Sequence, residues 1–186
     1  MACNPDLSVV LLPIRPRYAS FIMDGHKKVE FRKTVFSSHP EFVVVYASSP
    51  VQRVLGYFRV SAVEVASVDS LWEDYGHVGC IGRDDFAAYY GDRDTGVVLR
   101  IGEVVALSEP MALADLGLNS RPPQSYSYAH AAVVDLIDRY IHDHPLVPVV
   151  EARLRSESRL RLEAAFTQGR GRFDLGRAAF APGVAT

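Results

Sequence analysis

The sequence predicts an α+β fold in which short helices separate the strands of one sheet. Residues 42–47 are continuously β-branched or aromatic, which is typical of a strand covered on both faces. Two longer stretches, 51–65 and 95–107, also have the pattern of strands, with helical segments between them. From residue 125 onward the apolar residues fall at helical spacing instead, which predicts a C-terminal helical extension.

The first elements are a buried strand and a short helix. Residues 8–14 are a short apolar run, and residues 15–24 follow as the helix. Pro16 suits the first helical turn, because the N–H that it lacks would have no helical partner there. Gly25 suits the position just past the helix, where a left-handed backbone is inexpensive only without a Cβ.

A strand with alternating character then follows Gly25. Its charged positions are Lys28, Glu30 and Arg32, and its apolar positions are Val29, Phe31 and Val35. This period of two predicts one face on the core and one polar face. Glu30 and Arg32 would project from the polar face about 7 Å apart, with Lys27 at the corner where the helix turns into the strand.

The middle of the chain is predicted as two short helices between the two long strands. Gly56 suits a bulge or a close approach within the first of these strands. Ser67 or Asp69 would cap the first helix. The segment 76–82 breaks it, and residues 84–90 form the second helix. The aromatic side chains here are expected in the core: Trp72, Tyr75, Phe86, Tyr89 and Tyr90.

The C-terminal part is predicted as two helices and a tail. Residues 126–142 have one apolar face and Ser125 as the expected cap, while residues 149–168 have a looser apolar stripe. The predicted division of the chain is a domain at 1–125, a helical extension at 126–168 and a flexible Gly- and Arg-rich tail at 169–186.

Composition narrows the class of protein. An apolar share of 48% is ample for a core, and a net charge of −2 gives no global attraction to nucleic acid. Cys3 and Cys80 are too few for a disulfide framework, so a reduced cytoplasmic interior is expected. No apolar run approaches the roughly 18 residues of a membrane span, and the N-terminus lacks a signal-peptide pattern. The excess of arginine, 17 against three lysines, suits a GC-rich bacterial genome.

Four segments in order resemble the ASCH (activating signal cointegrator homology) domain family of the PUA-like superfamily. They are residues 13–19 leading to Gly25, Lys27, Glu30 and Arg32; residues 46–50; residues 54–56; and residues 121–126. The resemblance spans about residues 9–128. It implies a PUA-like β-pseudobarrel of mainly antiparallel strands with short helices around it, to which the C-terminal helical extension is added.

The resemblance also implies that Lys27, Glu30 and Arg32 line a cleft proposed to bind RNA. Lys27 and Arg32 would hold phosphate or a polar base edge, and Glu30 would orient one of them. From the spacing alone the alternative is a surface ion pair on a solvated strand, worth about 0–1 kcal/mol. The predicted function is binding of RNA, other nucleic acid or a nucleotide-like small molecule.

Two further segments are candidates for ligand contact. The family places the loop with Ser48 and Ser49 beside the cleft, although the same residues also suit a strand-ending turn. Gln124 and Tyr126, with Tyr128, would offer an amide and stacking surfaces. Their simpler interpretation is a rigid entry to a capped helix.

An enzyme is the alternative, with Lys27 and Glu30 as candidate catalytic residues. Some small members that resemble this family deacylate acetylated cytidine with the motif lysine, which Lys27 matches, but Glu30 stands at the threonine position. Other members are described as nucleases. Because Glu30 between two cations would be a weak base, the sequence favours binding over an amidohydrolase or ribonuclease.

No cofactor or metal site is predicted. His142 and His144 have no third ligand at a sensible spacing, and no glycine-rich phosphate loop or dinucleotide fingerprint is present in the sequence. The sequence makes no prediction of the oligomeric state.

Overall fold

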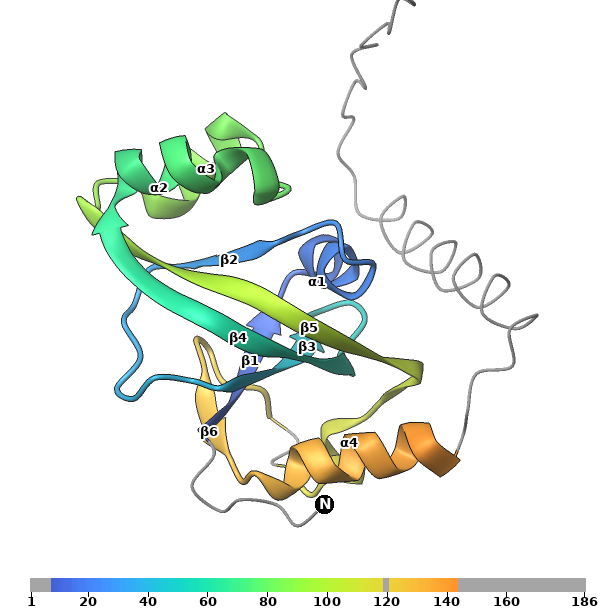
Figure 1. The fold of residues 1–186 in the computed structure, drawn as a ribbon. Coiled ribbons are helices and arrows are strands. Elements are labelled where there is room, and N and C mark those ends of the chain that lie inside the picture. Colours follow the sequence, from blue (N-terminus) through green and yellow to red (C-terminus); the bar gives the residue numbers. More distant parts are fainter. Residues whose placement is uncertain (1–7, 119–120, 144–186) are drawn as a thin grey trace, which may run out of the picture.

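The fold is built on one curved sheet of six strands in the order β2-β5-β4-β3-β1-β6 (Figure 1). A computed structural model describes residues 8–118 and 121–143. The strands are β1 (Val9–Ile14), β2 (Val29–Arg32), β3 (Phe42–Ala47), β4 (Arg53–Ser67), β5 (Thr95–Met111) and β6 (Ser127–Ala129).

The sheet is mixed and mainly antiparallel, which confirms the predicted α+β class. β1 and β3 run parallel, and every other neighbouring pair is antiparallel. β2 and β6 lie at opposite edges of the strand order, so the described part of the sheet is not closed. Gly56 has φ +146°, and a Cβ there would collide with the carbonyl oxygen of Val105, as the predicted close approach requires.

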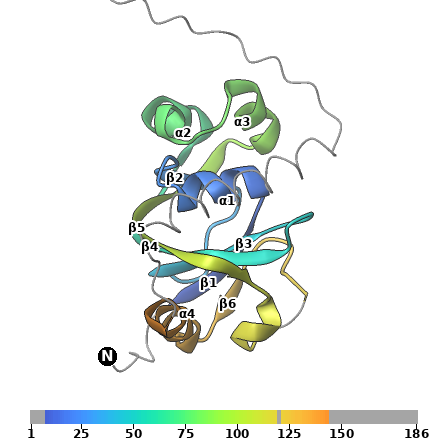
Figure 2. The same ribbon diagram turned by 90° about the vertical axis from the view of Figure 1, so that its right-hand side faces the viewer.

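The helices cover both faces and one end of the sheet. α1 lies over one face and α4 under the other, while α2 and α3 cover the far end of β4 and β5 (Figures 1 and 2). Ser67 Oγ accepts a hydrogen bond from the Ser70 N–H at 3.1 Å, which confirms the predicted cap of α2. The bounds are α1 (Pro16–Met23), α2 (Val68–Tyr75), η1 (Gly76–Val78), α3 (Arg83–Tyr90), η2 (Leu113–Leu116) and α4 (Ala132–Asp143).

Three apolar clusters form the core of the described part of the chain. Leu12, Ile22 and Phe58 belong to the cluster that includes α1, and Leu11 and Ile137 belong to the cluster that includes α4. The third cluster lies under α2 and α3 and contains all of the aromatic residues predicted to pack there: Trp72, Tyr75, Phe86, Tyr89 and Tyr90. No helix of the described residues is long and apolar enough to cross a membrane.

The predicted helix at 126–142 begins too early. Residues 127–129 form β6 and pair with β1, and α4 starts only at Ala132. Without β6 the backbone groups at this edge of β1 would have no partner in the sheet, so strand pairing overrides the helical spacing here. The predicted helix at 149–168 and the tail at 169–186 lie outside the described residues, and the predicted domain division stays a prediction.

Candidate functional site

A cleft of about 500 Å³ lies between α1, β2, α3 and the segment before β6. Its described lining includes five cationic side chains and two carboxylates, a local excess of three positive charges. The whole chain carries a net charge of −2, so the cleft concentrates positive charge that the sequence as a whole lacks. The charged residues are Arg15, Lys27, Arg32, Lys33 and Arg93, with Glu30 and Asp85.

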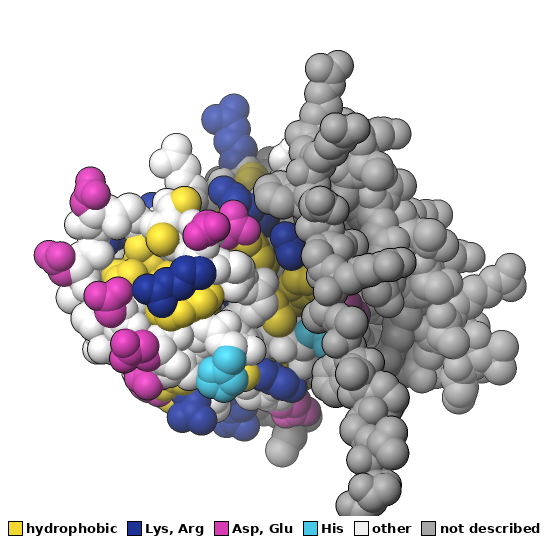
Figure 3. Space-filling view, turned by 90° about the horizontal axis from the view of Figure 1, so that it is seen from above, with side chains coloured by type: hydrophobic (Ala, Val, Ile, Leu, Met, Phe, Trp, Pro, Cys, Tyr) yellow, Lys and Arg dark blue, Asp and Glu magenta, His cyan; other side chains and the backbone are white. Residues whose placement is uncertain are grey.

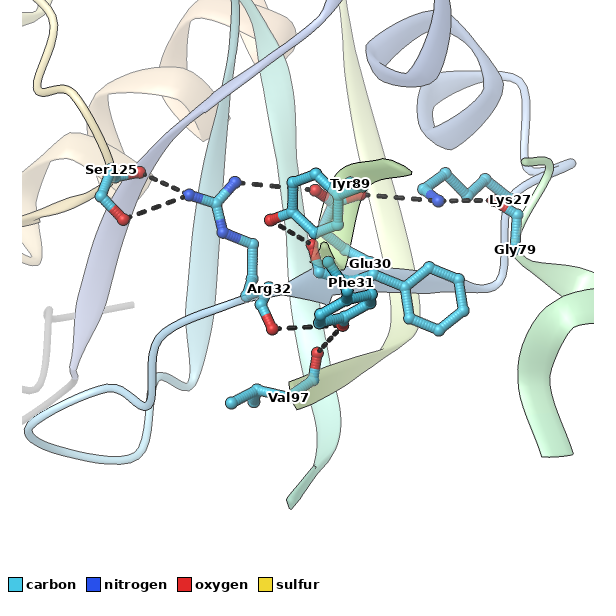
Figure 4. A network of polar contacts seen from close by, with 9 residues as sticks. Lys27, Glu30, Phe31, Arg32, Gly79, Tyr89, Val97 and Ser125 are labelled. Carbon is cyan, nitrogen blue, oxygen red and sulfur yellow. Dashed lines mark hydrogen bonds and ion pairs between the residues drawn. The ribbon is translucent and has the colours of Figure 1, made fainter. Parts of the chain in front are cut away.

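Lys27 stands where the chain turns from α1 into β2 (Figure 4). Its backbone N–H donates to the Phe21 carbonyl at 2.9 Å, which fixes the corner after the helix. Its Nζ donates to the Gly79 carbonyl at 2.5 Å and lies 5.3 Å from the ring centroids of both Tyr18 and Phe31. With 3% of its surface exposed, Lys27 is a buried cation.

Glu30 lies between the two motif cations. Its Oε2 is 3.6 Å from Lys27 Nζ, and its Oε1 is 3.8 Å from an Arg32 guanidinium nitrogen. At these distances both contacts are ion pairs rather than direct hydrogen bonds. The alternative of a solvated surface pair is therefore wrong, because Glu30 is only 7% exposed and the strand face that carries it forms a cleft wall.

Arg32 reaches from β2 to the opposite edge of the sheet. Its guanidinium donates to the Ser125 carbonyl at 2.8 Å and lies 3.4 Å from Ser125 Oγ (Figure 4). β2 and β6 are not paired in the sheet, and this contact links β2 to the residues that lead into β6. β2 ends at Arg32, so Val35, predicted on its apolar face, lies beyond the strand and is 55% exposed.

Two tyrosines complete the cleft. Tyr89, on α3, donates to the Phe31 carbonyl at 3.3 Å, and Lys33 Nζ lies 5.0 Å from its ring centroid. Tyr18, on α1, also lines the cleft and lies beside Lys27. Burial is the main cause that raises the pKa of both phenols above the ordinary value. Both therefore remain protonated at neutral pH.

The cleft gathers some of the predicted ligand-binding residues and not others. Lys27, Glu30, Arg32 and Gln124 line it, whereas Ser48, Ser49 and Tyr126 are not among its lining residues. Ser48 lies in the turn after β3, where its N–H donates to the Ile14 carbonyl at 2.8 Å. Tyr126 packs against Phe36, with ring centroids 4.7 Å apart. Ligand contact by these three residues stays a prediction.

Sequence reasoning missed several residues of the lining. Lys33 directly follows Arg32, and Tyr18 lies in the segment 13–19 before the motif. Their proximity to the motif in sequence could have identified both residues. Asp85 and Arg93 come from α3 and the turn after it. They reach the cleft only because α3 packs against β2 through Phe86, which lies 4.9 Å from Phe31 between centroids.

The site has the chemistry to bind an anion, with two carboxylates also in its lining. Thr34 is a hydroxyl in the lining, and Glu30 is a possible base. Across the described residues, no group of three His, Cys, Asp or Glu side chains has the arrangement to hold a metal ion. His144, one of the two histidines considered for metal, lies outside those residues.

Comparison with known proteins places the chain in a family. A family model described as the ASCH domain matches residues 12–108. An ASCH domain-containing ribonuclease from Zymomonas mobilis is 26% identical over 127 residues, which are 67% of this chain and 86% of that protein.

Solved structures agree in fold. The crystal structure of ASCH from Zymomonas mobilis superposes with a TM-score of 0.64 at 22% identity and covers 70% of this chain and 94% of that one. A mutant form of that protein gives a TM-score of 0.65, also at 22% identity, over 73% of this chain and 98% of that one. Because the family model matches more than half of the sequence, the chain belongs to the ASCH domain family.

Proposed function

We propose that the cleft binds single-stranded RNA or a nucleotide-like ligand. The observation that carries this proposal is the collection of five cations against two carboxylates in a cleft of about 500 Å³. A hollow of this kind focuses the field on an anion, and the phosphate backbone dominates affinity for nucleic acids. The similarity to a relative named as a ribonuclease supports RNA as the class of ligand.

Lys27 and Arg32 retain donors for a phosphate. An ammonium has three donors, and the Gly79 carbonyl takes one from Lys27. A guanidinium has five donors, and the contacts to Ser125 use one nitrogen of Arg32. Glu30 holds both cations by charge at 3.6 and 3.8 Å, so it orients them toward the cleft without occupying their donors in short hydrogen bonds.

The remaining lining suits a nucleobase and its sugar. Tyr18 and Tyr89 offer aromatic surfaces and protonated hydroxyls in the lining of the cleft. Gln124 offers an amide that both donates and accepts, as a base edge requires. A base would contact these groups while its phosphate contacts the cations.

A ribonuclease is the second candidate function, and the name of the relative favours it. In such a reaction the ribose 2′-oxygen attacks the adjacent phosphorus and its proton passes to Glu30. The bond to the 5′-oxygen breaks, and that oxygen takes a proton from Lys27. Both carboxylate oxygens of Glu30 are already held in ion pairs, one with Lys27 at 3.6 Å and one with Arg32 at 3.8 Å, so neither oxygen is free to receive the proton of a 2′-hydroxyl. We therefore expect binding to exceed cleavage, and no turnover of acetylated cytidine.

The binding proposal is tested with two lysine variants, one at the cleft and one away from it. Lys33→Ala removes a cation from the lining, whereas the neighbouring Lys28 is exposed and does not line the cleft. Affinity for a fluorescent oligouridylate is measured by anisotropy over a range of salt concentrations. We expect Lys33→Ala to weaken binding and lower the salt slope by about one unit, and Lys28→Ala to change neither. Equal effects of the two variants would reject the cleft as the binding site.

The cleavage candidate needs a separate assay. Native protein and Glu30→Gln are incubated with unmodified RNA and with acetylated cytidine in buffer containing a chelator. Background levels of product from both proteins would support a binding function alone. RNA fragments formed by native protein and absent with Glu30→Gln would establish the ribonuclease.

A further inference from the structure

A second hollow of about 410 Å³ lies beside the cleft, between α1 and the segment 76–82. Ile81 lines both hollows, so they adjoin at this side chain. The wall of the second hollow includes Arg17, Phe21, His26 and His77. Among its described lining residues no carboxylate is present, which gives it positive character without a competing negative charge.

Arg17 connects the two hollows. Its guanidinium carbon lies 5.7 Å from the centroid of the Phe21 ring, one helical turn away, and 6.0 Å from the centroid of the Tyr18 ring. Phe21 lines the second hollow, and Tyr18 lines the cleft. Arg17 is exposed, so its charge is available to a ligand that runs from one hollow to the other.

The wall between the hollows is held in place by the motif itself. Lys27 Nζ donates to the Gly79 carbonyl at 2.5 Å, and the Lys28 N–H donates to the Val78 carbonyl at 3.0 Å. On the α1 side, the His26 N–H donates to the Phe21 carbonyl at 2.9 Å. The second hollow is thus built before a ligand arrives, which reduces the entropy lost on binding.

We propose that this second hollow is a subsite for the neighbouring nucleotide of a single-stranded RNA whose first nucleotide lies in the cleft. The inference rests on the proposed function of the cleft. Phe21 supplies a stacking surface, Arg17 a contact for the linking phosphate, and the histidines hydrogen-bonding groups at the rim. In the view from above, histidine and Lys or Arg side chains lie together along the lower edge with one acidic side chain beside them, while other acidic side chains lie along the left rim and in the upper middle (Figure 3).

The chain contains a close control for Arg17. Arg59 is also exposed, and its guanidinium carbon lies 5.7 Å from the centroid of Phe42, as that of Arg17 lies 5.7 Å from Phe21. Arg59 and Phe42 line neither hollow. Arg17→Ala and Arg59→Ala therefore remove the same charge from the same kind of contact, at different places.

The test compares ligands of one and two nucleotides. Uridine monophosphate and 2′-O-methyl diuridylate are titrated into the full chain by calorimetry, because the modified ribose prevents cleavage by the 2′-oxygen. We expect the native protein to bind the dinucleotide about five- to a hundredfold more tightly, the usual gain for one stacked base. Arg17→Ala and Phe21→Leu are expected to lose most of this gain and to bind the mononucleotide as before. Arg59→Ala is expected to keep the gain.

The outcomes separate the subsite from the cleft. A gain that survives in Arg17→Ala and Phe21→Leu would overturn the subsite while leaving the function of the cleft intact. Equal affinities of native protein for the two ligands would also overturn the subsite. Failure of the native protein to bind either ligand would overturn the proposed function and the inference that rests on it.

Discussion

Two polar contacts on the same sheet differ in how tightly they are made. On one face the Tyr57 hydroxyl donates to Asp138 Oδ1 at 2.7 Å and ties α4 to β4. On β2, Glu30 is held by ion pairs of 3.6 and 3.8 Å to Lys27 and Arg32. Burial, followed by the Asp138 hydrogen bond, raises the pKa of Tyr57, so the donor keeps its proton at any physiological pH.

The difference indicates which of the two contacts has hydrogen-bond donors left for a ligand. A short hydrogen bond between one donor and one acceptor is satisfied within the protein, and it contributes to stability. A carboxylate shared at longer distance between two cations leaves donors of both cations for an incoming anion. The Tyr57–Asp138 contact is thus structural only, whereas the Lys27–Glu30–Arg32 cluster is structural and also suited to recognition.

The largest expected effect comes from removing the face that contains the Tyr57–Asp138 contact. A chain ending at residue 125 lacks β6 and α4, which exposes the edge of β1 and the apolar cluster around Leu11 and Ile137. We expect this chain to lose cooperative thermal unfolding, because the helix buries an apolar face that the sheet also needs. A chain ending at residue 168 is expected to melt within a few degrees of the full chain. Equal melting of the shorter chain would contradict the account.

Lys27→Ala is expected to lower the free energy of unfolding less than the truncation does, but more than a surface substitution does. It leaves Glu30 buried with a single partner and the Gly79 carbonyl without its donor. Breaking a buried ion pair costs about 3–5 kcal/mol. Because Lys27 is buried, this loss exceeds the about 0–1 kcal/mol that the sequence alone suggested for a surface ion pair at these positions. Urea unfolding measures the change, with Lys33→Ala as a control expected within about 0.5 kcal/mol of native.

Tyr57→Phe is the smallest of these changes and sharpens the comparison. It removes only the hydroxyl that donates to Asp138, and the ring stays in the core. Loss of a hydrogen bond to a charged group costs about 1.5–3 kcal/mol. Affinity for RNA should stay within about twofold of native, since Tyr57 does not line the cleft. If Tyr57→Phe instead lost much of its affinity for RNA and kept its free energy of unfolding, the Tyr57–Asp138 contact would serve binding rather than stability, which would contradict the account.

Much of the fold was predictable because local signals and tertiary structure agree. Pro16 and Gly25 bracket α1, and Gly25 has φ +71°, the left-handed conformation that its position required. The β-branched run at 42–47 is β3, covered on both faces as predicted. The helical spacing gave a wrong prediction at residues 126–131. There β6 pairs with β1, and this pairing depends on the free edge of the sheet rather than on the local spacing of apolar residues.

The candidate site was predictable only where its residues lie in the motif. Lys27, Glu30 and Arg32 converge as the turn at Gly25 and the period of two require. The burial of Glu30 was not predictable, because it depends on segments distant in sequence, such as Ser125 and α3. The contributions of Tyr89 and Arg93 likewise follow from the packing of α3 on β2.

The central claim is that the charged cleft beside β2 is the RNA-binding surface. Backbone amide chemical shifts of the full chain during titration with 2′-O-methyl diuridylate test it most directly. We predict the largest shifts at Lys27, Arg32, Lys33 and Tyr89, with α4 unchanged. Shifts concentrated on α4 or β6, with the residues around Glu30 unmoved, would contradict the claim.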